Sequence, residues 1–274
     1  MKIQDIKVNL HTHTSYCDGN NAPEELVREA IALGMDTLGF SGHSYTPFDA
    51  GYTMSQEGTE QYCRDILRLK EQYADRINLL LGIEQDIFAP IAPQRFDFCI
   101  GSVHYVCLDG EYVSVDDTLE IAERGVADHC GGDWYRFTKA YYETVATVVD
   151  KTGCDIVGHF DLVAKFNEKY PRFDESNPRY LHPAMEALDA LLEKNAVFEI
   201  NTGAMAKGYR RLPYPAPIFL HRIAEKQGRV TLSSDAHDLS KLLFGFSEAC
   251  RILRACGISR VLVMGKGGWQ ELGI

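Results

Sequence analysis

The sequence has no long hydrophobic run and no excess of positive charge. Its 28 lysines and arginines are outnumbered by 39 acidic residues, which gives a formal net charge of −11. So acidic a chain lacks the basic face of a non-specific nucleic-acid binder, although bound cations would reverse the local field for a short oligonucleotide. No apolar stretch has the length of a membrane span. We therefore expect neither a membrane nor a nucleic acid as a partner, and the oligomeric state stays open.

Several catalytic motifs are also missing. There is no P-loop, no G-x-G-x-x-G after the first expected strand, no G-x-S-x-G, and no C-x-x-C among the eight cysteines. Cysteines in apolar runs such as FDFCIG behave as small hydrophobic residues, and nothing marks Cys17 as an activated nucleophile. The start, MKIQDIKVNLHTH, alternates apolar and polar residues, unlike a signal peptide. Free thiols without an export signal predict a cytoplasmic protein.

What the chain does contain is a regular alternation of strand-like and helix-like segments. We expect strands at residues 7–13, 36–43, 77–84, 96–104, 154–160, 196–201, 229–237 and 260–264, and helices at 21–33, 59–73, 133–150, 177–194 and 217–226. Apolar strands separated by helices are typical of parallel βαβ units, and seven or eight such units indicate a (β/α) barrel. Without a linker or repeat, residues 1–274 are expected to form one domain.

Nine side chains of metal-binding type lie at or just beyond the ends of these strands. They are His11, His13, Asp18, His43, Glu84, His104, His159, Asp235 and His237. In a parallel barrel the strand ends form the catalytic face, so these residues would converge there, whereas an open sheet would not readily join its first, middle and last strands. Histidine and carboxylate ligands suit Zn, Mn or Fe. Nine ligands predict two or three ions, a tool for hydrolysing phosphate esters.

Each motif alone also fits a simpler role. Residues two apart in a strand point to the same face, so His11 and His13 could share an ion, as could Asp235 and His237. Yet such pairs also occur on ordinary surfaces, and Asp18-Gly19 suits a plain turn. The strongest single candidate is the carboxylate that ends INLLLGIE at residue 84, because a charge after so apolar a strand is costly unless it is paired or metal-bound. A buried ion pair with arginine is the alternative there.

The remaining histidines serve as a comparison set and are expected to be structural. His129 lies in an acidic segment that we expect to be irregular, and His182 and His221 lie near expected helix starts, where His182 could still line a pocket.

As an ordered set, H-x-H…D-G, H, E, H, H and D-x-H over residues 11–237 resembles the PHP (polymerase and histidinol phosphatase) superfamily. The segments GSVHY (101–105), GHFDLVAKF (158–166) and EINTGAMAKGYR (199–210) are similar to its histidinol-phosphatase branch. The resemblance implies an α/β fold, a distorted (β/α)7 TIM-like barrel with a trinuclear metal centre. It also implies hydrolysis of a small phosphate monoester, L-histidinol phosphate above all, in histidine biosynthesis.

Carried over by position, the resemblance implies three ion sites. The first would be held by His11, His13, Glu84 and Asp235. Glu84 would bridge to a second ion, completed by His104 and His159. The third would be held by Asp18, His43 and His237. Some relatives place a histidine one residue later in the Asp18 loop, so the third site can differ in metal preference or occupancy.

Further residues are expected to bind the substrate or move protons. Lys165 and Arg210 are the first choices for clamping the phosphate, with Lys207 and Arg211 in reserve, and a solvated surface charge is the alternative for each. Either Asp235 or His237 could pass a proton to the leaving alkoxide, and Glu111, Asp161 or another loop acid could bind the substrate ammonium. Two other functions remain open: a PHP phosphoesterase acting on nucleotides or oligonucleotides, and a non-catalytic, regulatory metal-binding domain.

Overall fold

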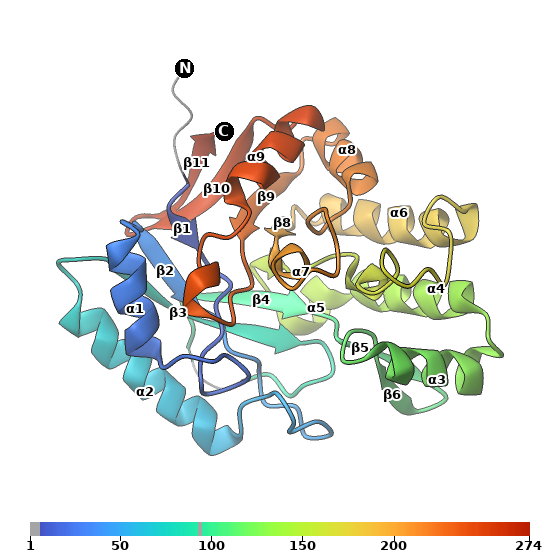
Figure 1. The fold of residues 1–274 in the computed structure, drawn as a ribbon, viewed down its shortest axis with the longest axis horizontal. Coiled ribbons are helices and arrows are strands. Elements are labelled where there is room, and N and C mark those ends of the chain that lie inside the picture. Colours follow the sequence, from blue (N-terminus) through green and yellow to red (C-terminus); the bar gives the residue numbers. More distant parts are fainter. Residues whose placement is uncertain (1–5, 93–94) are drawn as a thin grey trace.

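A curved sheet of mostly parallel strands forms the centre of the molecule (Figure 1). The structure is a computed structural model that describes residues 6–92 and 95–274. In spatial order the sheet contains β1 (Val8–Asn9), β2 (Thr37–Phe40), β3 (Asn78–Asp86), β4 (Phe98–Ser102), β7 (Ile156–Val157), β8 (Val197–Asn201), β9 (Arg229–Ser233), β10 (Arg260–Gly265) and β11 (Gly268–Gly273). Neighbouring strands from β1 to β10 are parallel, and β11 returns antiparallel to β10.

The first seven strands of this order close on themselves just beyond the ends of β1 and β9. A parallel bridge joins Thr12 to Ala236. The His13 amide donates to the Ala236 carbonyl at 2.8 Å, and the Ala236 amide donates to the His11 carbonyl at 3.1 Å. Because β10 also pairs with β9, the sheet continues past this junction instead of ending at it. The result is the predicted barrel of seven parallel strands, distorted by a two-stranded extension.

Helices cover the outside of the sheet (Figure 1). They are α1 (Pro23–Ala32), α2 (Gln56–Gln72), α3 (Leu119–Cys130), α4 (Trp134–Val145), α5 (Val148–Thr152), α6 (Pro178–Glu193), α7 (Gly203–Ala206), α8 (Pro217–Glu225) and α9 (Phe246–Ala255), with 3-10 turns at Leu162–Ala164 and Leu239–Lys241. Three of them, α1, α6 and α8, begin with proline, whose fixed φ and missing amide hydrogen suit the first helical position. No helix of the described residues is long and apolar enough to cross a membrane.

Apolar side chains fill one end of the barrel and leave the other end to polar ones. The ring of Phe98 occupies the space beside two strand glycines: a Cβ at Gly82 would lie 2.3 Å from it, and one at Gly39 would lie 2.8 Å from it. Phe98 and Leu10 are buried, at 1% and 0% exposed. This packing fixes β2, β3 and β4 against each other, so the side chains at their C-terminal ends have defined positions.

The eight expected strands are all present, and β1, β2, β4, β7 and β9 are shorter than expected. The hairpin β5 (Tyr105–Leu108) and β6 (Glu111–Ser114), the last strand β11 and the helices α3, α7 and α9 are additions that the sequence did not predict. His129 therefore lies in α3, not in an irregular segment; the Thr118 side chain caps this helix at its start, and Gly131 ends it in a left-handed conformation.

The helix expected at 133–150 is also corrected, because it is two helices, α4 and α5, separated at residues 146–147. The sequence TVATVV spans the break, and β-branched residues lose side-chain freedom in a helix.

Candidate metal centre

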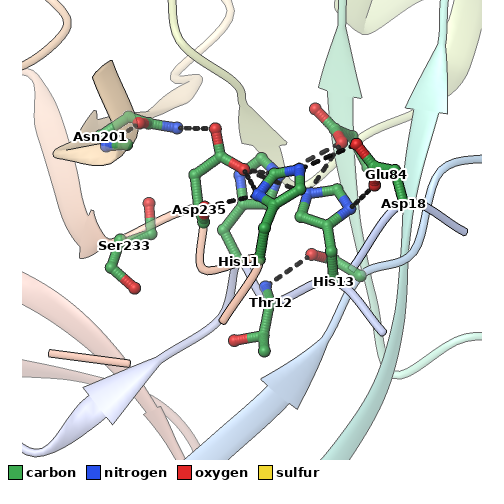
Figure 2. Close-up of polar contacts among 12 residues, drawn as sticks. His11, Thr12, His13, Asp18, Glu84, Asn201, Ser233 and Asp235 are labelled. Atoms are coloured by element: carbon green, nitrogen blue, oxygen red, sulfur yellow. Dashed lines mark hydrogen bonds and ion pairs between the residues drawn. The ribbon is translucent and has the colours of Figure 1, made fainter. Parts of the chain in front are cut away.

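All nine expected ligands meet at the C-terminal ends of the barrel strands. Glu84 lies inside β3, two residues before its end, whereas the others follow their strands. Figure 2 shows His11 and His13 side by side, with Glu84 and Asp18 on one side of them and Asp235 on the other. A parallel bridge between His43 and Glu84 continues the pairing of β2 with β3 and sets the backbone positions of these two residues.

The carboxylate of Glu84 lies at the centre of the cluster and is 1% exposed. Its Oε1 faces two imidazoles, those of His159 at 3.0 Å and His104 at 3.4 Å. Its Oε2 faces three more, those of His43 at 2.9 Å, His11 at 3.2 Å and His13 at 3.5 Å. The Ser102 hydroxyl also donates to Oε1 at 2.7 Å. The two oxygens thus face different groups of imidazoles, as a bridging ligand requires.

A second group of ligands lies nearer to solvent. Asp18 faces His13 at 3.4 Å and His43 at 3.6 Å through Oδ1, and His237 at 3.0 Å through Oδ2. Its side chain is 31% exposed, against 15% for His237. Together with His13 and His43 these two residues are close enough to hold one ion.

Asp235 connects the two groups. Its Oδ1 lies 3.1 Å from His13 Nε2, 3.4 Å from His237 Nδ1 and 3.6 Å from His11 Nε2. The residue has a φ of 50°, a left-handed conformation that is uncommon outside glycine and that aspartate tolerates better than most residues. A Cβ at Gly203 would lie 2.8 Å from Asp235 Oδ2, so the chain opposite has no room for a side chain.

The buried atoms of this cluster fit a metal ion. His11 Nε2, His13 Nε2 and Glu84 Oε2 are all buried without a hydrogen-bond partner, and these three residues form one of the groups that could hold an ion. Leaving such atoms unsatisfied costs about 1–3 kcal/mol each. An ion bound between them would satisfy all three, and imidazole with carboxylate is a donor set suited to Zn, Mn or Fe.

Without ions, protons take over part of the charge balance. Burial would raise the pKa of Glu84, but the imidazoles of His11, His43 and His104 hold it well below its usual range. Burial would lower the pKa of His11, yet the carboxylates of Glu199, Glu84 and Asp235 raise it well above its usual value.

His13 behaves in the opposite way, because burial and the neighbouring His237 and His43 lower its pKa to about 3. The imidazoles therefore cannot all be protonated together. A metal ion bound by this cluster would have to displace the protons that the imidazoles hold without it.

Two buried acids of the site were missed by the sequence analysis. Glu199 of β8 lies 2.5 Å from His11 Nδ1, and Asp86 of β3 accepts hydrogen bonds from the His104 amide at 3.1 Å and from its Nδ1 at 3.2 Å. Both could have been found, because Glu199 interrupts the apolar strand VFEIN and Asp86 shares a strand face with Glu84.

A cleft opens beside the cluster, and two of the four expected phosphate-binding cations line it. These are Lys165 and Lys207. Lys165 Nζ donates to the Asp116 carbonyl at 2.5 Å and lies 3.2 Å from its carboxylate. Lys207 is exposed and forms no ion pair with the described residues. Burial would raise the pKa of Asp235, but the neighbouring histidines, together with Lys207, hold it well below its usual range.

The other two cations lie away from this cleft, which corrects the sequence-based expectation. The buried Arg210 donates to the Ala164 carbonyl at 2.8 Å and to Glu175 at 3.1 Å. Arg211 has an 89% exposed side chain that pairs with Glu168 at 2.5 Å. Helix α7 is a single turn that follows β8. It places residue 207 at the cleft, and the two arginines that follow lie outside the cleft.

The two acids expected to bind the substrate ammonium, Glu111 and Asp161, also lie away from the cleft. Glu111 is 75% exposed beside His129, and Asp161 is fully buried with a pKa that burial raises to about 6. Neither lines the cleft, whereas Asp116 and Asp117 do. Burial and Asp18 raise the pKa of Cys17 to about 11, which agrees with the absence of an activated thiol.

A parallel barrel whose strand ends gather buried histidines and carboxylates around unsatisfied ligand atoms has the architecture of a metal-dependent enzyme. The family model of the PHP domain matches residues 9–203, and the chain belongs to this family, as the ligand order predicted. Asp235 and His237 lie beyond the matched range, but the structure brings them to the same cluster.

Relatives of known description extend over most of the chain. It is 30% identical to the "Probable histidinol-phosphatase" of Deinococcus radiodurans over 260 residues, covering 90% of this chain and 92% of the relative. It is 25% identical to the histidinol-phosphatase of Bacillus subtilis, covering 88% of this chain and 98% of the relative.

A solved structure confirms the fold. The histidinol phosphate phosphatase of Lactococcus lactis, crystallised with zinc, L-histidinol and phosphate, superimposes with a TM-score of 0.74 at 21% identity, covering 97% of this chain and 99% of the other.

Proposed function

We propose that this protein is a metal-dependent histidinol-phosphatase, which hydrolyses L-histidinol phosphate to L-histidinol and phosphate in histidine biosynthesis. The convergence of nine metal-type ligands around the buried Glu84, beside a cleft with two lysines, carries the proposal. Relatives with this name match nearly the full length of the chain. A cytoplasmic location and a single domain remain predictions from the sequence.

The metal-binding side chains are proposed to be the full set expected from the sequence, holding two to three ions of Zn, Mn or Fe. They are His11, His13, Asp18, His43, Glu84, His104, His159, Asp235 and His237. When bound, such ions polarise the phosphate and lower the pKa of water to about 7, which makes hydroxide available at neutral pH. The unsatisfied buried atoms of His11, His13 and Glu84 support the deep part of this set.

Two lysines of the cleft are proposed to bind the phosphate oxygens. Lys165 is held in place by the carbonyl and carboxylate of Asp116, so its ammonium group is oriented before substrate arrives. Lys207 has no ion-pair partner among residues 6–92 and 95–274, so its charge is available to the substrate. Both lysines place positive charge at the cleft, although the chain as a whole has a net negative charge.

Asp235 and His237 are both proposed as residues that relay a proton to the leaving alkoxide, and both line the cleft. Both nitrogens of His237 are already engaged, Nδ1 with the Asp235 carbonyl at 2.9 Å and Nε2 with the Asp18 carboxylate at 3.0 Å. The carboxylate of Asp235 lines the cleft itself and is 17% exposed.

Asp117 is our candidate for binding the ammonium group of L-histidinol phosphate. Two acids follow β6 at the edge of the cleft, and the charge of Asp116 is balanced by Lys165. Asp117 forms no ion pair within the described part of the chain, and its amide donates to the Ser114 hydroxyl at 3.1 Å, which fixes its backbone. It can therefore accept a cationic group without losing an existing partner.

Phosphate release from a panel of substrates tests the function directly. The panel contains L-histidinol phosphate, several nucleotides and an aryl phosphate, each assayed with the zinc- or manganese-loaded protein. We expect the highest kcat/KM for L-histidinol phosphate. If another substrate is preferred, the assigned substrate is wrong while the phosphoesterase class stands, and if no phosphate is released from any of them, the class itself is wrong.

A further inference from the structure

Strand β8 provides none of the nine expected ligands, although it lies between β7 and β9, which precede His159 and Asp235. It carries two polar residues, Glu199 and Asn201, which point to the same face because they are two positions apart. Glu199 is 1% exposed and Asn201 is 0% exposed. Polar groups so deeply buried in a strand require partners, and their partners lie in the metal centre.

Both oxygens of Glu199 are engaged. Oε1 lies 2.5 Å from His11 Nδ1 and also accepts the Ser233 hydroxyl in a short hydrogen bond. Oε2 accepts the backbone amide of His159 at 2.8 Å and the side-chain amide of Asn201 at 3.0 Å. One carboxylate therefore contacts the segments after β1 and β7 together with β8 and β9.

We propose that Glu199 is a positioning residue that orients His11 for metal binding. The carboxylate accepts the proton on His11 Nδ1, so Nε2 is the nitrogen that would offer its lone pair to a bound metal ion. That nitrogen is the one without a hydrogen-bond partner, and it faces Glu84 Oε2 at 3.2 Å. A hydrogen bond to one ring nitrogen of histidine sets the state of the other and raises its basicity as a ligand. The inference rests on the proposed metal site but not on the identity of the substrate.

The same network extends to Asp235 through Asn201. The Asn201 side-chain amide, bound to Glu199, also lies 3.4 Å from Asp235 Oδ2, and its Oδ1 accepts the Gly203 amide at 2.7 Å. Figure 2 shows Asn201 reaching toward Asp235 from the side opposite Glu84. Glu199 thus supports two of the ligands proposed for the first ion, His11 directly and Asp235 through one intermediary.

The test is the zinc affinity of Glu199→Gln, measured by competition with a chromophoric chelator of known affinity. Loss of a carboxylate that supports a histidine ligand typically weakens metal binding about 10- to 100-fold, and we expect a loss in this range for one ion. Glu175→Gln is the matched control, because Glu175 also pairs its carboxylate with a buried cation, Arg210, but contacts no expected ligand. The control should bind zinc as the unchanged protein does.

Cadmium-113 NMR of the cadmium-loaded protein supplies a readout that a purely structural role would not produce. In Glu199→Gln, one resonance should shift or broaden while those of the other ions stay in place. The proposal is wrong if zinc affinity and cadmium spectrum both match those of the unchanged protein, or if Glu175→Gln loses affinity to the same extent.

Ser233→Ala covers the case in which Glu199→Gln does not fold. It removes one donor to Glu199 and keeps the charge, so a smaller loss of zinc affinity, of a few fold, is expected; an unchanged affinity would then overturn the proposal. A failure of the proposed function looks different, because an unchanged protein that binds no zinc contradicts the metal site itself. Zinc binding without hydrolysis of L-histidinol phosphate leaves the role of Glu199 intact.

Discussion

The candidate metal centre has a deep part and a rim part, and they differ in how firmly the protein holds the proposed ligands. In the deep part, His11 and Glu84 are 0% and 1% exposed, and neighbouring groups hold them in place: Glu199 contacts His11, and the Ser102 hydroxyl contacts Glu84. In the rim part, Asp18 is 31% exposed and lies on a loop, and its carboxylate faces only histidines of the cluster.

From this difference we expect the cluster to combine a firmly held and an exchangeable ion site. Ligands that are buried and supported by hydrogen bonds are already oriented before an ion arrives, so binding costs little rearrangement. At the rim, Asp18 and His237 are partly exposed to water, so an ion there is bound in part by less firmly held ligands. We therefore expect the ion between His13, Asp18, His43 and His237 to leave first when metal is withdrawn.

The largest effect is expected from Glu84→Gln, which removes the charge that faces five imidazoles. Loss of a residue that only supports a metal ligand lowers metal affinity or activity about 10- to 100-fold. Loss of the central carboxylate should therefore lower kcat by more than about 100-fold. Metal analysis should also show the loss of more than one ion per chain. Glu168→Gln, which breaks only the surface pair with Arg211, is the control; a Glu84→Gln protein with full metal and near-normal turnover would contradict the bridging role.

A smaller effect is expected from Asp18→Ala, because this substitution removes a proposed ligand of the rim part only. This variant should lose a single ion on dialysis and retain the deep ones. We expect kcat/KM to fall by about 10-fold, which corresponds to ~1.4 kcal/mol of transition-state stabilisation. Atomic emission analysis of metal content, with steady-state kinetics on the same sample, checks both values. Equal losses of metal from Asp18→Ala and Glu84→Gln would remove the distinction between the two parts.

The pH dependence of the metal-free protein is a third, more modest effect. Burial would lower the pKa of His43, but Glu84 and Asp18 raise it from 6.5 to about 9. A raised histidine pKa stabilises the fold fully below about pH 6.5, and the contribution is lost as the pH rises toward 9. Chelator-treated protein should therefore become less stable to urea between pH 6.5 and 9. In His43→Gln, the stability to urea should depend less steeply on pH. If this dependence is unchanged, a group other than His43 causes it.

The smallest effect is expected from Asp117→Asn at the edge of the cleft, away from both parts of the centre. An exposed ion pair contributes up to about 1 kcal/mol, so KM for L-histidinol phosphate should rise by no more than about 5-fold. The KM for an aryl phosphate without an amino group should not change, which makes this substrate the internal control. A parallel rise for both substrates would show that Asp117 does not act on the ammonium group.

The sequence predicted that these nine side chains converge at one end of the barrel, because their signal is simple. A charged or imidazole side chain directly after an apolar strand is costly to bury unless it is paired or metal-bound, and parallel strands bring their C-terminal ends together. The same logic could have identified Glu199, which interrupts VFEIN. It could not have shown that Glu199 supports His11, because that depends on how β1 and β8 lie across the barrel.

The cleft was harder to predict from the sequence than the metal centre. Lys207 and Arg210 are three residues apart after the same strand, and only the turn of α7 decides that the first lines the cleft while the second is buried against Glu175. The segment from β5 to α3, which supplies Asp116 and Asp117, interrupts the alternation of strands and helices and therefore gave no periodic signal.

The bridge between Thr12 and Ala236 has a consequence for how the protein is made. A chain emerges from the ribosome beginning at its N-terminus, so His11 and His13 leave early, while the segment that pairs with them leaves more than two hundred residues later. Until then the barrel is open, and Asp235, which lies 3.1 Å from His13 in the folded protein, does not yet exist in the nascent chain. If the nine side chains are the metal ligands, full loading with metal can occur only after residue 237 has been synthesised, and a ribosome that stops short of residue 235 would release a chain with an incomplete set of ligands.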